Sequence, residues 1–274
     1  LSGDNKVGFW QYLPKTSYPK YLGDRNMKLL LNDVSYLKSS IEVISGLIIE
    51  TRLSITKEGM SIISNDPANV AMVIFKIFSS TFITYELEKP IEVGIRLKDI
   101  SDILRKARDG DTLTIGYEEP KLIFTLKGKT LRNFKINTSD IEDKEYKIPN
   151  LQFDYEIKTK SNLVKDAIDT CDIIKDDVGV RLVGNPQQLK FQSEDSNNEA
   201  NDTIKSDKDT EIKTEKEVKV KLSKEYMKHI VEGSKVSDDV KIHIKDDYPI
   251  KVDYIVPDKI DLSFILAPRI DKDD

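Results

Sequence analysis

An internal duplication constrains this chain more than any single motif does. A helical pattern, a series of alternating strand patterns, a second helical pattern and a meander of strands occupy residues 27–136, and the same order returns across residues 153–268. Leu37 in the first helical pattern matches Leu163 in its counterpart, 126 residues further on. Solenoid repeats run to about 20–50 residues, so this much longer period indicates two similar domains side by side.

Each repeat combines two helices with a larger number of strands. In the first repeat, apolar residues keep helical spacing over 34–48 and 100–107 and alternate as in strands over 51–56, 113–117, 122–126 and 131–136. Helical spacing returns in the second repeat near 161–174 and 223–233. Ile230 there matches Ile103 at a distance of 127 residues. We therefore expect an α+β fold in which strands dominate and each domain has two helices.

Shifts in composition divide the chain into four parts. We expect a tail, a first domain, a connector, and a second domain that ends in a short acidic tail, over residues 1–26, 27–136, 137–152 and 153–274. The first part holds the only tryptophan, Trp10, and shows no periodicity, so we expect a disordered or non-native tail before Met27. An aromatic peptide that docks on a partner is the alternative. A polar insertion at 193–208 favours a loose or partly disordered hairpin.

The composition fits two cores of ordinary size in a cytoplasmic protein. The chain has 274 residues, of which 38% are hydrophobic and 33% are charged. No run approaches the roughly 18–20 apolar residues that span a bilayer, and the N-terminus lacks a leader pattern, so we expect no membrane contact. The single cysteine, Cys171, cannot form an internal disulfide. It shares an apolar helix face with Leu163 and Ala167, which favours core packing.

The sequence offers little for catalysis. Its two histidines, His229 and His243, have no partners at the spacing of a metal site or a catalytic triad. Acidic doublets at 176–177, 238–239 and 246–247 could hold Mg²⁺, although acidic pairs are also common in turns. We therefore expect a non-enzymatic protein without catalytic residues, metal or cofactor. A Mg²⁺-dependent enzyme that uses these doublets is the distant alternative.

Two short motifs carry a resemblance to a known family. Residues 66–70 read Asp-Pro-Ala-Asn-Val, and residues 266–270 read Leu-Ala-Pro-Arg-Ile. Both stand in register with the duplication, and the acidic connector ends in Ile148 and Pro149. With these features the chain resembles the proliferating cell nuclear antigen family, and within it the archaeal DNA sliding clamps. The resemblance covers residues 27–270.

The resemblance implies a homotrimer, a ring with duplex DNA passing through its centre. Six domains would place their helices around the hole and their sheets in the outer wall, and the ring would act as a processivity factor in DNA replication and DNA repair. The partners implied are duplex DNA, DNA polymerase, flap endonuclease, DNA ligase and a clamp loader. A topological link of this kind needs only sparse, non-specific phosphate contacts. A subunit of a heterotrimeric or checkpoint-type clamp is the near alternative.

The DNA-facing residues implied by the resemblance are cations on the helix sides that face away from the apolar stripes. They are Lys38, Lys98, Arg105, Lys106, Lys165, Lys224 and Lys228. The net charge of −5 argues against nucleic-acid binding when taken alone, but acidic clusters elsewhere could hide a weakly basic face. Asp102, Asp169 and Glu232 stand among the cations. An ordinary mixed-charge helix surface is therefore the alternative.

The resemblance also implies a groove beneath the connector, in which partner proteins dock a short peptide with a glutamine and two aromatic residues. Carried over by position, its lining residues are Val70, Ile148, Pro149, Pro249, Ile265, Ala267 and Pro268. Exposed apolar patches mark interaction sites, and an aromatic side chain that fills this one would act as a hot spot. Ile148 could instead only pin the connector to the sheet.

Subunit contacts in this family pair an edge strand of one repeat with an edge strand of the other repeat in the next molecule. The corresponding residues here are Leu131, Phe134 and Ile136 on one side and Thr203 and Ile204 on the other. Head-to-tail contacts of this kind form a ring when the rotation between copies closes. The second strand is poor in strand-forming residues, which leaves open a weak ring or one built with sister subunits.

Overall fold

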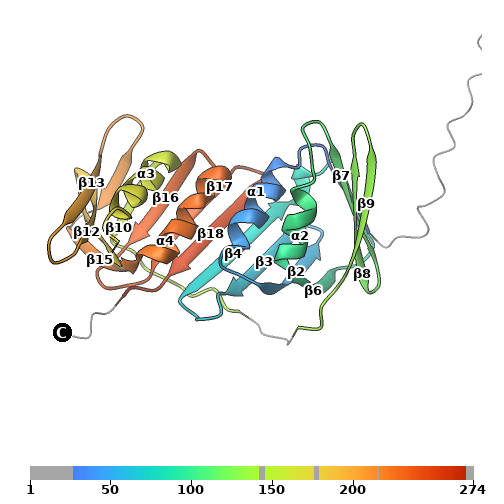
Figure 1. The fold of residues 1–274 in the computed structure, drawn as a ribbon, viewed down its shortest axis with the longest axis horizontal. Helices are drawn as coiled ribbons and strands as arrows, with labels where there is room; N and C mark the ends of the chain where they lie inside the picture. The colour runs from blue at the N-terminus through green and yellow to red at the C-terminus, as the bar shows by residue number, and fades with distance from the viewer. Residues whose placement is uncertain (1–26, 142–145, 176–178, 215, 270–274) are drawn as a thin grey trace, which may run out of the picture.

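The computed structural model shows two halves built from the same elements in the same order (Figure 1). It describes residues 27–141, 146–175, 179–214 and 216–269. The tail expected at 1–26 lies outside these described residues. Within the described ranges, no helix is long and apolar enough to cross a membrane.

Each half contains nine strands and two α-helices among the described residues. The first half contains β1 (Met27–Leu31), α1 (Ser35–Ile44), β2 (Glu50–Thr56), β3 (Gly59–Asn65), β4 (Ala71–Phe78), the 3-10 helix η1 (Ser79–Thr81), β5 (Thr84–Leu87), β6 (Ile91–Arg96), α2 (Leu97–Leu104), β7 (Thr112–Glu118), β8 (Lys121–Lys127) and β9 (Leu131–Asn137). The second half contains β10 (Tyr155–Lys160), α3 (Ser161–Cys171), β11 (Gly179–Asn185), β12 (Gln188–Glu194), β13 (Glu199–Lys205), β14 (Glu211–Thr214), β15 (Val218–Ser223), α4 (Lys224–Ile230), the 3-10 helix η2 (Val231–Lys235), β16 (Asp239–Ile244), β17 (Ile250–Val256) and β18 (Ile260–Leu266).

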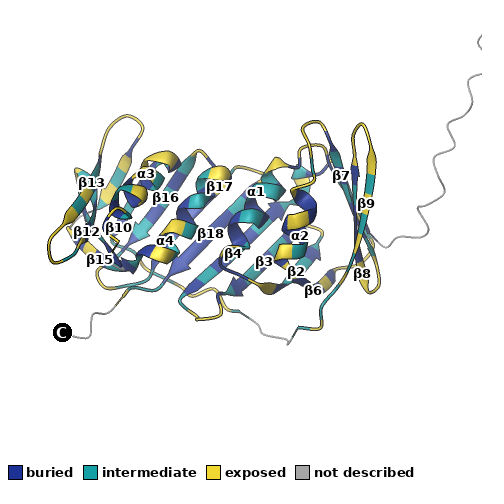
Figure 2. Cartoon of the chain, viewed as in Figure 1, coloured by how far each residue is buried: buried dark blue, intermediate teal, exposed yellow. Residues whose placement is uncertain are grey.

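The strands form three sheets, and the largest one joins the two halves. Its nine strands follow the order β14-β10-β16-β17-β18-β4-β3-β2-β6, with β18 of the second half antiparallel to β4 of the first. A five-stranded sheet, β5-β1-β7-β8-β9, and a four-stranded sheet, β13-β12-β11-β15, stand at the two ends of the molecule (Figure 1). The four α-helices of the described residues lie on one face of the nine-stranded sheet. Figure 2 shows buried residues along the central strands and exposed residues on the helices and in the outer turns.

The two halves correspond strand by strand. The order β5-β1-β7-β8-β9 recurs as β14-β10-β16-β17-β18, and the order β4-β3-β2-β6 recurs as β13-β12-β11-β15. The prediction of an α+β fold with two similar domains, dominated by strands, is therefore confirmed. Inside the molecule, β18 and β4 pair with each other, whereas their counterparts β9 and β13 each end a separate sheet.

The first helices of the two halves bury equivalent residues at an offset of 127. Leu37 of α1 is 2% exposed, and Val164 of α3 is fully buried. Leu163, which the sequence pattern matched to Leu37, is 40% exposed instead. Neighbouring residues in a helix point about 100° apart, so only one of the two can face the sheet. The expected match was wrong by one residue, and Cys171 packs in the core with Val164 rather than with Leu163.

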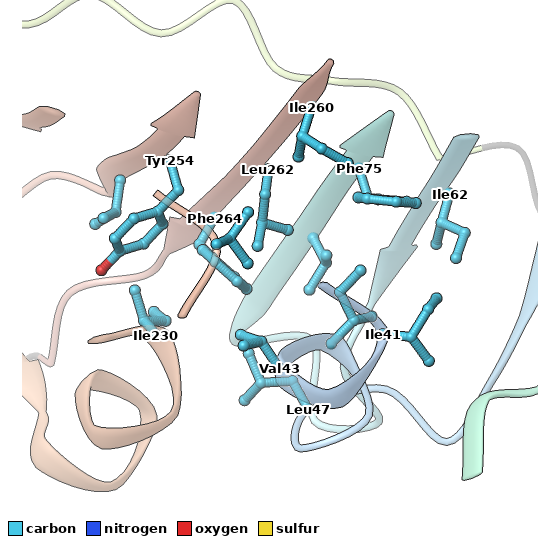
Figure 3. Close-up of a cluster of buried hydrophobic side chains, with 14 of the residues drawn as sticks. Ile41, Val43, Leu47, Ile62, Phe75, Ile230, Tyr254, Ile260, Leu262 and Phe264 are labelled. Carbon is cyan, nitrogen blue, oxygen red and sulfur yellow. The ribbon is translucent and has the colours of Figure 1, made fainter. Parts of the chain in front are cut away.

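A continuous hydrophobic core runs across the junction of the two halves (Figure 3). Leu262 and Phe264 of β18 lie beside Phe75 of β4, and Ile41 of α1 and Ile230 of α4 cover them from the helix layer. None of these five side chains is more than 2% exposed. The junction therefore shows how the last strand of one repeat pairs with a strand of the other.

The polar insertion expected at 193–208 is an ordered hairpin. β12 and β13 pair antiparallel along their whole length. Ile204 of β13 is 6% exposed, and Asp195 closes the turn by accepting hydrogen bonds from the backbone N–H groups of Asn197 and Asn198, both at 2.8 Å. The expectation of a loose hairpin was wrong because an edge strand with one polar face looks like a disordered segment in sequence.

Candidate nucleic-acid and partner interfaces

Six of the seven cations expected to face DNA are accessible on the helix layer. Lys98, Arg105, Lys106 and Lys228 are exposed, and Lys38 and Lys165 are half-buried. They come from all four α-helices or from the residues just after them. A cationic surface spread over four helices can follow a phosphate backbone without reading bases.

Carboxylates neutralise part of this surface. Its ion pairs join Arg105 with Asp102, Lys165 with Glu232, Lys175 and Lys228 with Asp172, and Lys235 with Glu42 and Glu232. Lys98 and Lys106 have no such partner among the described residues. The helix layer therefore carries mixed charge with a few uncompensated lysines, which suits weak and salt-sensitive phosphate contacts.

Lys224 was expected to face DNA, and the structure contradicts this. The residue is 5% exposed, and its Nζ donates hydrogen bonds to the backbone carbonyl groups of Cys171 (3.5 Å) and Ile174 at the end of α3. The last carbonyl groups of a helix lack partners within the helix, and a lysine there satisfies them and is favoured by the helix dipole. Its counterpart 127 positions earlier is the fully buried Leu97. Lys224 was misassigned because the first residue of α4 points back into the fold.

Five of the seven predicted groove residues lie where β4 begins and β18 ends. They are Val70, Pro249, Ile265, Ala267 and Pro268. The N–H group of Ala267 donates to the carbonyl group of Val70 at 2.9 Å, which extends the β18–β4 ladder past Leu266. Ile265 is 7% exposed, and the other four are half-buried. The apolar cluster thus sits at the end of the strand pair that joins the two halves.

Asp66 organises the loop that carries Val70. Its carboxylate accepts hydrogen bonds from the backbone N–H groups of Ala68 (3.0 Å), Val70 (2.7 Å) and Ala71 (2.7 Å), and from the hydroxyl group of Tyr226 on α4 (2.6 Å). Burial would raise the pKa of Asp66, but these hydrogen bonds outweigh it and hold the pKa below its ordinary value. The bond to Asp66 in turn raises the pKa of Tyr226 to about 12. One carboxylate therefore fixes the loop and ties it to the helix layer.

The connector is anchored on both sides of the β18–β4 junction. Near its start, Arg52 of β2 donates a hydrogen bond to the carbonyl group of Ile141 at 3.0 Å. At its end, Phe153 packs on the ring of His243 of β16, with centroids 5.3 Å apart. β4 and β18 lie between β2 and β16 in the sheet, so the connector passes this strand pair on its way. Residues 142–145 of the connector lie outside the described ranges.

Ile148 and Pro149, the remaining two groove residues, lie in the connector between these anchors. Both are exposed, Ile148 to 49%. An isoleucine with half of its surface in water gains free energy when a partner covers it, at about 25 cal/mol per Å² of apolar area. The seven predicted residues therefore come from four segments of the chain, namely the loop before β4, the connector, the turn before β17 and the end of β18.

A buried ionic cluster holds the histidine on which the connector ends. Asp253 is 4% exposed, and its carboxylate oxygens lie 3.1 Å from His243 Nε2, 2.5 Å from Ser263 Oγ and 2.9 Å from Lys251 Nζ. Burial would raise the pKa of Asp253, but the hydrogen bonds from His243, Ser263 and Lys251 lower it further than burial raises it. Glu156 Oε2 lies 3.5 Å from the other ring nitrogen of His243. The imidazole ring is thus fixed from both sides.

The predicted subunit-interface residues lie on β9 and β13, each of which is one of the two edge strands of an end sheet. On β9, Leu131 is 58% exposed, and Phe134 and Ile136 are half-buried. On β13, Thr203 is half-buried and Ile204 is 6% exposed. β9 corresponds to β18 and β13 to β4 in the repeat, so each edge has the place of a strand that is paired inside the molecule.

The acidic doublets have ordinary partners where the structure describes them. Asp239 accepts a hydrogen bond from Lys160 Nζ at 2.6 Å, and Asp246 accepts one from the N–H group of Lys219 at 2.6 Å. The doublet at 176–177 lies outside the described residues. In the described part of the chain, no cluster of three or more His, Cys, Asp or Glu side chains could hold a metal ion.

The sequence did not reveal the polar groups that hold the loop at Val70 and the histidine at the end of the connector. Asp66 lies inside a motif that was recognised, but its partner Tyr226 is 160 positions away and sits on an otherwise mixed helix face. Asp253 alternates with apolar residues in β17, a pattern that usually means a solvated outer face. The one usable signal was Asp66 itself, because an aspartate just before a tight turn commonly accepts hydrogen bonds from the N–H groups that follow.

Family models match both halves of the chain. The N-terminal domain of proliferating cell nuclear antigen matches residues 24–156, and the C-terminal domain matches residues 147–269. The two matches follow one another in the order of the repeats and together span the described residues.

Individual relatives match most of the chain at low identity. The chain is 27% identical over 233 residues to a protein of Pyrococcus furiosus named DNA polymerase sliding clamp, covering 85% of this chain and 94% of the relative. It is 28% identical over 250 residues to a protein of the same name from Nanoarchaeum equitans, covering 89% and 100%. The crystal structure of proliferating cell nuclear antigen from Entamoeba histolytica matches with a TM-score of 0.84 at 19% identity, over 90% of this chain and all of that one, which shows the same fold.

Proposed function

This chain belongs to the proliferating cell nuclear antigen family, and from that membership we propose that it is a DNA polymerase sliding clamp, a ring that encircles duplex DNA and tethers other enzymes to it. The observation that carries the proposal is the match of both family domains, in order, over residues 24–269. Relatives that this chain matches along nearly their whole length carry the name DNA polymerase sliding clamp, which supports it.

The ring would consist of three copies joined head to tail. Pairing of β9 in one copy with β13 in the next would merge a five-stranded and a four-stranded sheet into a nine-stranded sheet with the strand order of the central one. Each contact between copies would then repeat the contact between the halves. Contacts of this heterologous type form a closed ring when the rotation between copies closes.

The helix layer would face the DNA and would hold it loosely. Lys98 and Lys106 are exposed and without ion-pair partners in the described structure, so they are free to contact phosphates. Most other cations of the layer are compensated by carboxylates, which limits the strength of binding. A ring closed around the duplex does not need tight binding, because it can leave only by opening or by sliding off an end.

The cluster at Val70, Ile148 and Ile265 would receive peptides of DNA polymerase, flap endonuclease, DNA ligase and the clamp loader. Tethering converts each later encounter with DNA into an intramolecular step at an effective concentration in the millimolar range, as for short flexible linkers. Processivity would thus arise from proximity rather than from chemistry on the clamp. We propose that the protein has no catalytic activity of its own and works in the cytoplasm.

Absolute mass by light scattering and a primer-extension assay test this function together. A mass of about 94 kDa, three times the 31.3 kDa of one chain, is expected for the ring. With a clamp loader and DNA polymerase of a related archaeon, products on primed circular DNA should lengthen, and Ile148→Ser should reduce the gain. Products of unchanged length with a correctly assembled ring would contradict the proposed function.

A further inference from the structure

The start of the connector has a counterpart in the second half of the chain. The N–H group of Ser139, where the connector begins, donates to the carbonyl group of Gly94 on β6 at 2.8 Å. In the same way, the N–H group of Arg269 donates to the carbonyl group of Lys221 on β15 at 2.8 Å. β15 is the counterpart of β6, and Lys221 lies 127 positions after Gly94. The chain that follows β18 therefore begins along the path that the connector takes after β9.

The end of the connector has its counterpart just before β1. The connector leads into β10 at Tyr155, and Met27 begins β1, the counterpart of β10, 128 positions earlier. Both residues are at most 1% exposed. In the order of the repeat, residues 1–26 therefore take the position of the connector, although they lie outside the described residues.

This correspondence gives residues 1–26 a path in the proposed ring. Between its contacts with Arg52 of β2 and His243 of β16, the connector passes the β18–β4 junction on the face of the sheet away from the helices. The counterpart of this junction is the one between copies, where β9 would meet β13. A segment on the same path before Met27 would cross the five-stranded sheet of its own copy and reach the β12–β13 hairpin of the neighbouring copy. Its length suffices, because the connector covers this path between Ile141 and Phe153 and 26 residues precede Met27.

The outer face of the β12–β13 hairpin has an uncompensated negative charge. Asp202 of β13 contacts Thr170 of α3 at 3.4 Å, so the alternating residue Glu199 points away from the helices. Glu199 lies directly opposite Glu194 of β12, and like charges in this arrangement destabilise a strand pair. Glu194 lies 3.2 Å from Arg181, whereas Glu199 is exposed and has no cationic partner among the described residues. A cation from outside the hairpin would relieve this repulsion.

The composition of residues 1–26 fits that face. The segment has only two carboxylates, those of Asp4 and Asp24, and its cationic side chains are Lys6, Lys15, Lys20 and Arg25. Counted at the offset of 128, Lys20 corresponds to Ile148 and Tyr18 to Tyr146 of the connector. Tyr146 lines a cleft on the outer face with Arg52 and Ile63. A tyrosine covers a large apolar area and keeps its hydroxyl group in water, which suits the surface of a sheet.

We propose that residues 1–26 of each copy cross the outer face of the junction between copies and bind the β12–β13 hairpin of the neighbouring copy, with Lys20 near Glu199. The proposal rests on the proposed ring and adds a second contact to each junction between copies. Every such junction would then be covered as the connector covers the junction inside one chain. A ring leaves DNA only by opening or by sliding off an end, so this contact would prolong its stay.

Chemical cross-linking in the full chain tests where residues 1–26 bind. Tyr21→Cys and Asn201→Cys would be combined and treated with a short bismaleimide, while Cys171 is fully buried and should not react. A link from one copy to the hairpin of the next should give bands of two and three chains on a denaturing gel. Tyr21→Cys with Lys158→Cys, an exposed position on β10 of the central sheet, is the matched control and should give single chains.

Charge reversal gives an independent arm of the test. Sedimentation velocity over a dilution series should show that the Lys20→Glu ring dissociates at a concentration at least about tenfold higher than the native ring, and the Lys20→Arg ring at the native concentration. A correctly assembled ring without links between chains, or a Lys20→Glu ring as stable as the native one, would overturn this contact while the proposed clamp function still stands. A native chain that stays monomeric at every concentration would overturn the contact and the proposed ring together.

Discussion

Removing the hydroxyl group of Tyr226 should loosen the loop that carries Val70. That hydroxyl donates at 2.6 Å to Asp66, whose carboxylate is almost fully buried. A hydrogen bond to a charged group contributes about 1.5–3 kcal/mol to stability. After Tyr226→Phe the same carboxylate oxygen still accepts a hydrogen bond from the N–H group of Ala68 at 3.0 Å. The free energy of unfolding should therefore fall by about 1.5 kcal/mol, the lower end of that range.

Asp66→Ala should cost more than Tyr226→Phe. It also removes the acceptor of the N–H groups of Val70 and Ala71, both at 2.7 Å, and Ala71 is buried away from water. With the bond from Ala68, three further hydrogen bonds are lost, and at about 1 kcal/mol each they bring the expected loss of unfolding free energy to about 4–5 kcal/mol. If the hydroxyl acts only through Asp66, Tyr226→Phe should have almost no effect in the Asp66→Ala background, and the double-mutant cycle should show a coupling of about 1.5 kcal/mol.

Urea unfolding followed by far-ultraviolet circular dichroism would measure these losses. All variants need the same chain concentration, since the stability of an oligomer depends on it. Affinity for a partner peptide should fall in step with stability of the loop. A Tyr226→Phe loss below about 0.5 kcal/mol, or losses that simply add in the double variant, would show that the hydroxyl group does not act through Asp66.

Three further outcomes are expected. Lys224→Met should lower the free energy of unfolding by about 1–2 kcal/mol without changing DNA affinity. Lys228→Met should weaken DNA binding and leave the free energy of unfolding nearly unchanged. Urea unfolding and DNA titrations at two salt concentrations distinguish the two roles. The pKa of Asp253 is lower in the folded chain than its unfolded value of about 3.9, so its contribution is complete above that pH and is lost as the pH falls through the folded pKa. Asp253→Asn should therefore make the free energy of unfolding depend less on pH in the acidic range, which urea unfolding at a series of pH values would measure. Ile148→Ser with Pro268→Ser should abolish peptide binding in calorimetry at unchanged mass, and loss of assembly instead would mark these residues as structural.

The fold could be predicted from the sequence because the apolar residues of both repeats are spaced as in helices and strands. The α+β class and the pair of helices in each half follow from apolar spacing alone. The spacing is less reliable for predicting which side of a single helix is buried. Two adjacent apolar residues, Leu163 and Val164, were both possible partners for Leu37, and only packing on the sheet shows that Val164 is the buried one.

Polar residues inside the fold could not be predicted from their own positions. Lys224 looks like any exposed lysine at the start of a helix until the end of α3 is placed beside it. The hydrogen bond between Asp66 and Tyr226 joins residues from opposite halves of the chain, and no local sequence pattern predicts it. The edge strand β13 was mistaken for a loose segment because Asp202 and its neighbours are polar.

Retention on circular DNA tests most directly whether this protein encircles the duplex. The protein would be loaded on nicked circular DNA with an archaeal clamp loader, separated from free protein by gel filtration, and the DNA then cut once by a restriction enzyme. The protein should travel with the circle and be released when the circle is opened, at salt concentrations where phosphate contacts alone are weak. Protein that stays on the linear DNA, or that never travels with the circle, would contradict it.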